Sequence, residues 1–176
     1  AIYITFDAPP QQIKSYMKKF GWNIEGKVII FIDVYSWKTG GIIEKYTISD
    51  PADLNAFNIV VSRAIKELEN MNLKRCAIDS LSTLFLYVPE DLCIRFASII
   101  LAKLKRAGTT QLVVINKDMH SEKVMASLEA ITDGTVELGV NPFGERTLEI
   151  KRMYATKHSL KTLKFKIIDK KGIVIE

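Results

Sequence analysis

The sequence predicts an α/β fold: one domain with a mostly parallel sheet and antiparallel additions. Three observations lead to this prediction. Short apolar runs alternate with amphipathic segments through the first two thirds of the chain. The run at residues 27–34 is apolar at most positions, which is typical of a strand buried on both faces in a parallel sheet. Residues 136–175 instead hold short apolar runs separated by turn sequences, which predicts a β-meander.

The first elements follow from periodicity. Residues 2–6 are predicted to form a strand, and residues 10–20 carry apolar side chains at helical spacing. Gly21 is suited to the end of that helix. The strand at 27–34 comes next, and residues 35–50, with Gly40 and Gly41, are predicted to be irregular.

A second helix is predicted to begin at Asp50 or Asp53, either of which can cap it, and to run to about residue 70. Residues 74–79 are predicted to form a strand and residues 90–107 a long helix. The inward positions expected on this long helix are Leu92, Phe96, Ile99, Ile100, Ala102 and Leu104.

The last third changes character. A strand is predicted at 111–115, and the antiparallel strands are predicted at 136–140, 146–153, 163–168 and 173–175. The sequences Asn-Pro-Phe-Gly and Asp-Lys-Lys-Gly between these strands are typical of turns.

Composition limits the class of protein. A chain of 176 residues is long enough to bury a substantial core. No apolar run is long enough to span a bilayer, so no membrane association is expected. Cys76 and Cys93 lie in apolar contexts and are predicted to be buried free thiols, which suits a cytoplasmic location. The net charge of +5 is spread along the chain and favours a solvated surface over a nucleic-acid site.

The strongest local motif is the apolar strand that ends in Asp79 and Ser80. Carboxylates at the carboxyl ends of parallel strands face the ligand crevice of such folds. In phosphate-binding ATPases an Asp at this place holds Mg²⁺. A strand-end Asp that merely caps the next turn is an equally good interpretation.

A second motif is misleading. Residues 21–27 satisfy Gly-x4-Gly-Lys, but a helix is predicted before them and a strand after them. A working phosphate loop needs the reverse order and a Ser or Thr after the lysine, where this chain has Val28. The match is therefore not expected to bind phosphate.

Residues 144–158 form a strand of alternating character with a basic end. An exposed antiparallel strand explains this pattern, and a basic finger that touches the phosphate of a neighbouring subunit is the alternative.

Taken together and in order, these segments resemble the KaiC-type branch of the RecA-superfamily ATPases, which has archaeal and bacterial members. The resemblance covers nearly all of the chain, and each part alone is weak. It rests on Tyr-Ile-Thr-Phe-Asp (3–7), Pro-Gln-Gln-Ile (10–13), Phe-Gly-Trp-Asn (20–23), Ile-Asp-Ser-Leu (78–81), Leu-Lys-Arg-Ala-Gly-Thr-Thr (104–110), Gly-Glu-Arg-Thr-Leu-Glu-Ile (144–150), Thr-Lys-His (156–158), Phe-Lys-Ile (165–167) and Lys-Gly-Ile-Val (171–174).

The resemblance implies a RecA-like twisted sheet with helices on both faces, and a homo-oligomeric ring or filament with ATP and Mg²⁺ between subunits. It implies that Asp79, with Ser80 beside it, is the Mg²⁺-site position, and that Asp7 is the acid that activates water. Arg152 and Tyr154 match the Lys and Arg of the family's Lys-x-Arg finger. The first strand, the phosphate loop and the first helix of the family would lie upstream of Ala1.

The chain departs from the family at several of these positions. Asp7-Ala8 replaces a pair of glutamates, and Tyr154 replaces the finger arginine. Asn116-Lys117 follows the strand where the family often has Thr-Thr-Glu, so Lys117 is a candidate position near nucleotide. These departures favour a nucleotide site that has lost hydrolysis, in a regulatory or assembly subunit. The alternative is an ATP-hydrolysing member, possibly a DNA-linked recombinase paralogue, whose phosphate loop lies upstream of Ala1.

An apolar stretch follows Asp79 and offers a different kind of site. Residues 81–89 carry no Arg, Lys or Gly, which argues against a DNA-contacting loop. The stretch fits packing or an exposed docking patch for a peptide or subunit. The candidate patch residues are Leu84, Phe85, Leu86, Tyr87 and Val88.

Overall fold

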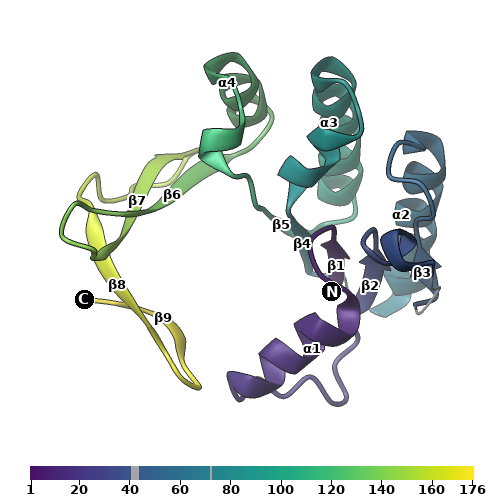
Figure 1. The fold of residues 1–176 in the computed structure, drawn as a ribbon, viewed down its shortest axis with the longest axis horizontal. Helices are drawn as coiled ribbons and strands as arrows, with labels where there is room; N and C mark the ends of the chain where they lie inside the picture. The colour runs from purple at the N-terminus through teal and green to yellow at the C-terminus, as the bar shows by residue number, and fades with distance from the viewer. Residues whose placement is uncertain (41–43, 72) are drawn as a thin grey trace. The chain divides into compact units, whose positions relative to one another are not determined.

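The computed structural model describes residues 1–40, 44–71 and 73–176. They divide into two compact units, the first made of Ala1–Ile13 with Gly26–Met125 and the second of Lys14–Glu25 with Ala126–Glu176. The first holds a mostly parallel sheet with helices, and the second holds a separate antiparallel sheet (Figure 1). The predicted α/β class is confirmed, whereas the expectation of a single domain stays a prediction.

The sheet of the first unit is parallel throughout its five strands, in the order β3-β2-β1-β4-β5. Four of them were predicted, and β2 is shorter than its apolar run. Its pairing with β1 begins at Ile2 and Ile30, and the backbone N–H of Ile30 donates to the carbonyl oxygen of Ala1 at 2.9 Å. The strands are β1 (Ile2–Thr5), β2 (Ile30–Asp33), β3 (Tyr46–Thr47), β4 (Arg75–Asp79) and β5 (Thr110–Val113).

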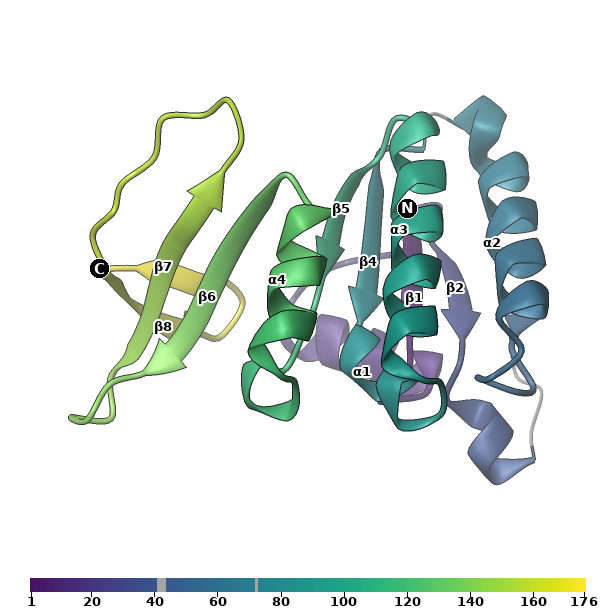
Figure 2. The same cartoon turned by 90° about the horizontal axis from the view of Figure 1, so that it is seen from above.

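Two long helices, α2 (Leu54–Leu68) and α3 (Glu90–Arg106), lie side by side over one face of this sheet (Figure 2). Asp53 caps α2, because its Oδ1 accepts hydrogen bonds from the backbone N–H groups of Asn55 and Ala56 at 3.1 and 2.9 Å. Of the two predicted caps, Asp53 is therefore the one used.

The buried stripe of α3 differs from the predicted one. Phe96, Ile100 and Leu104 are buried as expected, but Leu92, Ile99 and Ala102 are exposed, so their inward assignment was wrong. Their neighbours Cys93, Ala97 and Leu101 take the inward positions instead. The helix is apolar around much of its circumference, and periodicity alone could not centre the stripe.

Shorter elements complete the described part. Helix α1 (Pro10–Lys19) precedes the Gly-x4-Gly-Lys match at 21–27, and strand β2 follows it. This confirms that the match lies between elements in the wrong order for a phosphate loop, which needs a strand before it and a helix after it. Helix α4 (Glu122–Ala130) was not predicted, since only Val124 and Leu128 are buried on it. Single turns are η1 (Ser36–Thr39), η2 (Glu69–Met71), η3 (Leu81–Leu86) and η4 (Lys117–Met119). Gly41 of the predicted irregular segment lies outside the described residues.

None of the helices in the described ranges combines the length and the apolar character needed to cross a membrane. Both cysteines are buried free thiols, as predicted.

The second unit contains the predicted meander as an antiparallel sheet in the order β6-β7-β8-β9. Gly172, at the start of β9, has φ +81°, and a Cβ there would lie 2.9 Å from the ring of Trp22. Only glycine satisfies both conditions. The strands are β6 (Gly134–Val140), β7 (Arg146–Met153), β8 (Leu163–Ile168) and β9 (Gly172–Ile175).

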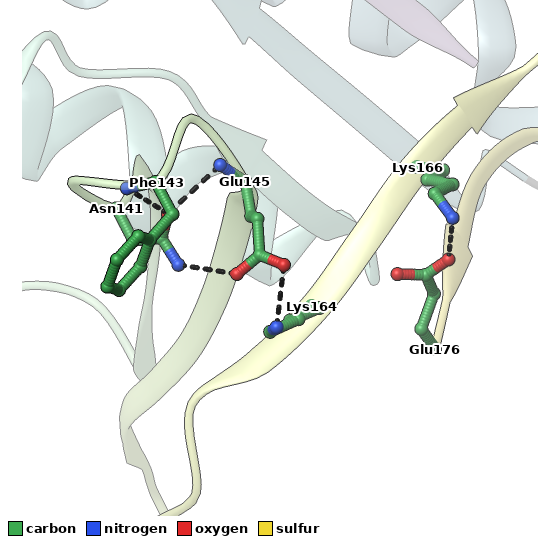
Figure 3. Close-up of polar contacts among 6 residues, drawn as sticks. All are labelled: Asn141, Phe143, Glu145, Lys164, Lys166 and Glu176. Carbon is green, nitrogen blue, oxygen red and sulfur yellow. Dashed lines mark hydrogen bonds and ion pairs between the residues drawn. The ribbon is translucent and has the colours of Figure 1, made fainter.

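The turn between β6 and β7 is held by side chains (Figure 3). Asn141 Oδ1 accepts from the backbone N–H groups of Phe143 and Glu145, both at 3.0 Å, and its Nδ2 donates to Glu145 Oε2 at 2.8 Å. Lys164 on β8 donates to the other carboxylate oxygen of Glu145 at 2.7 Å. The turn is thus tied to the third strand of its own sheet.

Candidate active site at the carboxyl edge of the parallel sheet

The carboxyl ends of β1 and β4 bring Asp7 and Asp79 to one edge of the sheet. The two strands pair in parallel register, with Thr5 opposite Asp79. The backbone N–H of Phe6 donates to the carbonyl oxygen of Asp79 at 2.8 Å, which continues the pairing to the residue before Asp7. The next peptide bond of β4, between Asp79 and Ser80, is cis.

Asp7 is held by two hydroxyl groups from the segment after β4. Ser80 Oγ donates to Asp7 Oδ2 at 2.8 Å, and Thr83 Oγ1 donates to Asp7 Oδ1. Both donors are buried, whereas Asp7 itself is exposed. Each oxygen of this carboxylate therefore already accepts a hydrogen bond from within the protein.

The carboxylate of Asp79 has a hydrogen-bond partner that was not predicted from the sequence. The hydroxyl of Tyr3 on β1 donates to Asp79 Oδ2 at 2.7 Å. Burial raises the pKa of Tyr3 above its ordinary value, and the hydrogen bond to Asp79 and the charge of Asp79 add to this effect. The phenol therefore stays protonated and remains a donor at neutral pH.

The edge fits part of a Mg²⁺–nucleotide site. Mg²⁺ keeps several waters and is bound through one or two carboxylates plus phosphates, and Asp79 Oδ1 accepts no hydrogen bond from the described residues. Asp79 would hold the ion, which would neutralise phosphate charge when bound. Within the described ranges, no group of three or more His, Cys, Asp or Glu side chains forms a closed metal cluster.

A second polar cluster joins the segments after β4 and β5. Ser82 Oγ accepts from the backbone N–H of Asn116 at 2.8 Å and lies 2.8 Å from His120 Nε2. The His120 ring also lies against Phe85, with 4.6 Å between ring centroids. Ser82 is fully buried, so this cluster fixes the two loops to each other.

This cluster predicts a pH dependence of stability. Burial lowers the pKa of His120, and the charge of Glu90 partly offsets this. Between the lowered pKa and the unfolded value of about 6.5 the unfolded chain binds more protons, so stability falls as the pH drops through this window. We expect the melting temperature of the protein to fall more between about pH 7.5 and about pH 5.5 than that of His120→Gln. Parallel melting curves for the two proteins would contradict this role of His120.

The two candidate finger residues, Arg152 and Tyr154, lie in the second unit and differ in the contacts that their side chains make. The guanidinium of Arg152 donates to the backbone carbonyl of Thr132 at 2.6 Å and to that of Glu129, at the C-terminal end of α4. Tyr154 is exposed, and its backbone N–H bonds the carbonyl of Asp133 at 2.7 Å. Arg152 thus caps a helix end within its own chain, while Tyr154 presents a neutral ring to solvent.

Of the remaining predicted site residues, some lie on the surface and others are buried in the core. Lys117 is exposed in η4, directly after β5. In the candidate patch, Leu84 and Val88 are buried and belong to the core, whereas Leu86 and Tyr87 are exposed. Only part of the proposed docking patch is therefore available to a partner.

Sequence reasoning missed three residues of this edge: Tyr3, Thr83 and His120. Tyr3 could have been found, because side chains alternate along β1 and Tyr3 shares a face with Asp79 once β1 and β4 are taken as neighbours. Thr83 lies in the short helix η3 and His120 directly follows η4, and such short helices are too brief for periodicity to predict the direction of a side chain.

Comparison with known proteins agrees with this architecture. The family model described as "ATPase: KaiC" matches residues 1–176. A UPF0273 protein of Thermotoga maritima is 35% identical over 99% of this chain and 74% of its own length. The circadian clock protein KaiC3 of Synechocystis is 28% identical over 99% of this chain and 35% of its own.

Among solved structures, a KaiC-like protein from Pyrococcus horikoshii matches with a TM-score of 0.71. It is 22% identical over 99% of this chain and 74% of the other, and this likeness concerns the fold. Because the family model matches the whole of this chain, and because the chain has the α/β fold of a KaiC-like structure, the chain belongs to the KaiC family of ATPases.

Proposed function

We propose that this chain is a KaiC-like domain with a degenerate nucleotide site, which acts as a regulatory or assembly subunit and hydrolyses ATP poorly or not at all. The surroundings of Asp7 carry the proposal. Both of its carboxylate oxygens accept hydroxyl hydrogen bonds, from Ser80 and Thr83. These bonds hold the carboxylate in place and occupy an acceptor position on each of its oxygens, which leaves Asp7 less free to turn toward an attacking water.

The shortened side chain adds to this effect. An aspartate reaches less far than the glutamate that the family resemblance implies, and Ala8 offers no second carboxylate. Misplacement of a catalytic group by about 1 Å can cost about a hundredfold in rate.

The second unit supports the same proposal. The guanidinium of Arg152 is occupied by carbonyl groups at the end of α4, so extending it toward another subunit would cost those hydrogen bonds. Tyr154 carries no charge with which to stabilise a transferred phosphoryl group.

The alternative, an ATP-hydrolysing enzyme, is favoured by one observation. The last strand of the parallel sheet, β5, lies at its edge. Leu112 in this strand is 71% exposed, and Val114 just after it is 44% exposed. Exposed apolar side chains on an edge strand suit a further strand beside it. A phosphate-binding strand upstream of Ala1 would fill that place, and Asp79 would then complete the Mg²⁺ site.

Assembly tests the proposed role. We expect the full-length protein to form the same oligomer, by native mass spectrometry, with MgATP and with a non-hydrolysable ATP analogue, and to keep it over hours. Because the proposal excludes efficient turnover, the two nucleotides should be interchangeable. An oligomer that decays in MgATP but persists in the analogue would contradict the proposal.

A further inference from the structure

A groove of about 610 Å³ runs between α2 and α3 and is open to solvent. Its lining residues come from the C-terminal ends of the two helices and from the segment just before β4. Figure 2 shows that these helix ends and the beginning of β4 lie at the same end of the sheet. Its apolar surface comes from Ile65, Leu73 and Ala107, of which Leu73 is buried. The carboxyl edge that carries Asp7 and Asp79 is at the other end of β4, so this groove is separate from the candidate active site.

Three cations line the groove: Lys66 on α2, and Lys103 and Arg106 on α3. Lys103 is fixed, because its ammonium donates to Ser62 Oγ at 2.7 Å and to Asn58 Oδ1. An ammonium has three donors, so one donor of Lys103 is left. Lys66 and Arg106 are exposed on either side.

These charges lack internal compensation. Among the described residues, none of the three cations forms an ion pair. In the described ranges the one carboxylate that lines the groove is that of Glu69, which is exposed at the end of α2. The groove therefore carries a net charge of about +2 beside an apolar floor.

We propose that the groove binds an acidic peptide segment of a partner protein, with apolar side chains of the peptide on Ile65 and Ala107 and its carboxylates on Lys66, Lys103 and Arg106. Charge complementarity selects this partner. An open groove cannot enclose most of the surface of a small anion, as small-molecule sites do. None of the described residues that line it is aromatic, so they provide no stacking platform of the kind that a single-stranded nucleic-acid site uses.

The test uses the full-length protein and a fluorescent peptide of about 15 residues that repeats Glu-Leu-Leu-Glu, with anisotropy as the readout. A second peptide carries glutamine in place of every glutamate. The groove variant is Lys66→Glu with Arg106→Glu. The matched control is Lys27→Glu with Lys161→Glu, which changes the net charge equally at exposed positions outside the groove.

We expect the acidic peptide to bind the wild type and the control alike, and the groove variant about tenfold or more weakly. Glu69→Gln should bind it more tightly, since the one opposing charge is removed. Circular dichroism and melting curves establish that each variant folds.

Several outcomes would overturn the proposal. They are an absence of binding, equal binding of the glutamine peptide, equal losses in the groove and control variants, and no gain in Glu69→Gln. Single-stranded DNA that binds the wild type and loses affinity only in the groove variant would assign the groove to nucleic acid instead. Inorganic phosphate that displaces the peptide at equal ionic strength would assign it to small anions.

Discussion

Replacing Phe57 with alanine is expected to lower the free energy of unfolding by about 3–5 kcal/mol. The side chain is 1% exposed, and its ring lies between Phe6 and Phe96, with centroid distances of 5.7 and 5.0 Å. Truncation would leave a cavity between α2, α3 and the sheet, in a part of the core lined by apolar side chains such as Phe6 and Phe96. Urea denaturation followed by circular dichroism measures the change.

The matched control is Ile59→Ala on the same helix. Ile59 is 51% exposed, so its truncation should cost less than about 1 kcal/mol. Similar losses for Phe57→Ala and Ile59→Ala would show that the core is not centred on Phe57.

The second prediction with a large effect concerns the degenerate site. Restoring the positions implied by the family, through Asp7→Glu, Ala8→Glu and Tyr154→Arg together, should raise ATP turnover of the full-length protein at least about a hundredfold. The glutamates would extend beyond the hydroxyls of Ser80 and Thr83, and the arginine would supply the missing charge. Phosphate release under saturating MgATP measures the effect.

Its control keeps the two glutamates and carries Tyr154→Phe in place of Tyr154→Arg. This protein has the restored acids but no finger charge, so its turnover should remain well below that of the arginine variant. No gain in the restored protein, although it folds and binds ATP, would contradict the view that these positions limit hydrolysis.

The sequence predicted the fold well because its signals are local. The apolar run before Asp33, the cap at Asp53 and the turn sequence around Asn141 each determine their element through neighbouring residues. Helix α4 was not predicted because few of its side chains are buried. The buried face of α3 was predicted wrongly because Leu92 and Ile99 are apolar yet exposed.

The candidate site was predictable only in part. Asp79 at the end of a strand indicates a carboxyl-edge position from the sequence alone. That Tyr3 donates to it and that Thr83 donates to Asp7 depends on contacts between residues 76 positions apart in each case. Likewise, the alternating pattern of β7 allowed either an exposed strand or a finger. The carbonyls that Arg152 contacts, of Glu129 and Thr132, lie in and just after a helix that the pattern did not predict.

The most direct test of the central claim is the rate of phosphate release from MgATP by the full-length protein, compared with that of Asp79→Ala. We expect background turnover in the wild type and no further loss in the variant, because there is little hydrolysis to remove. Turnover of about 1 s⁻¹ or more in the wild type, abolished in Asp79→Ala, would contradict the account and establish the protein as an ATP-hydrolysing enzyme.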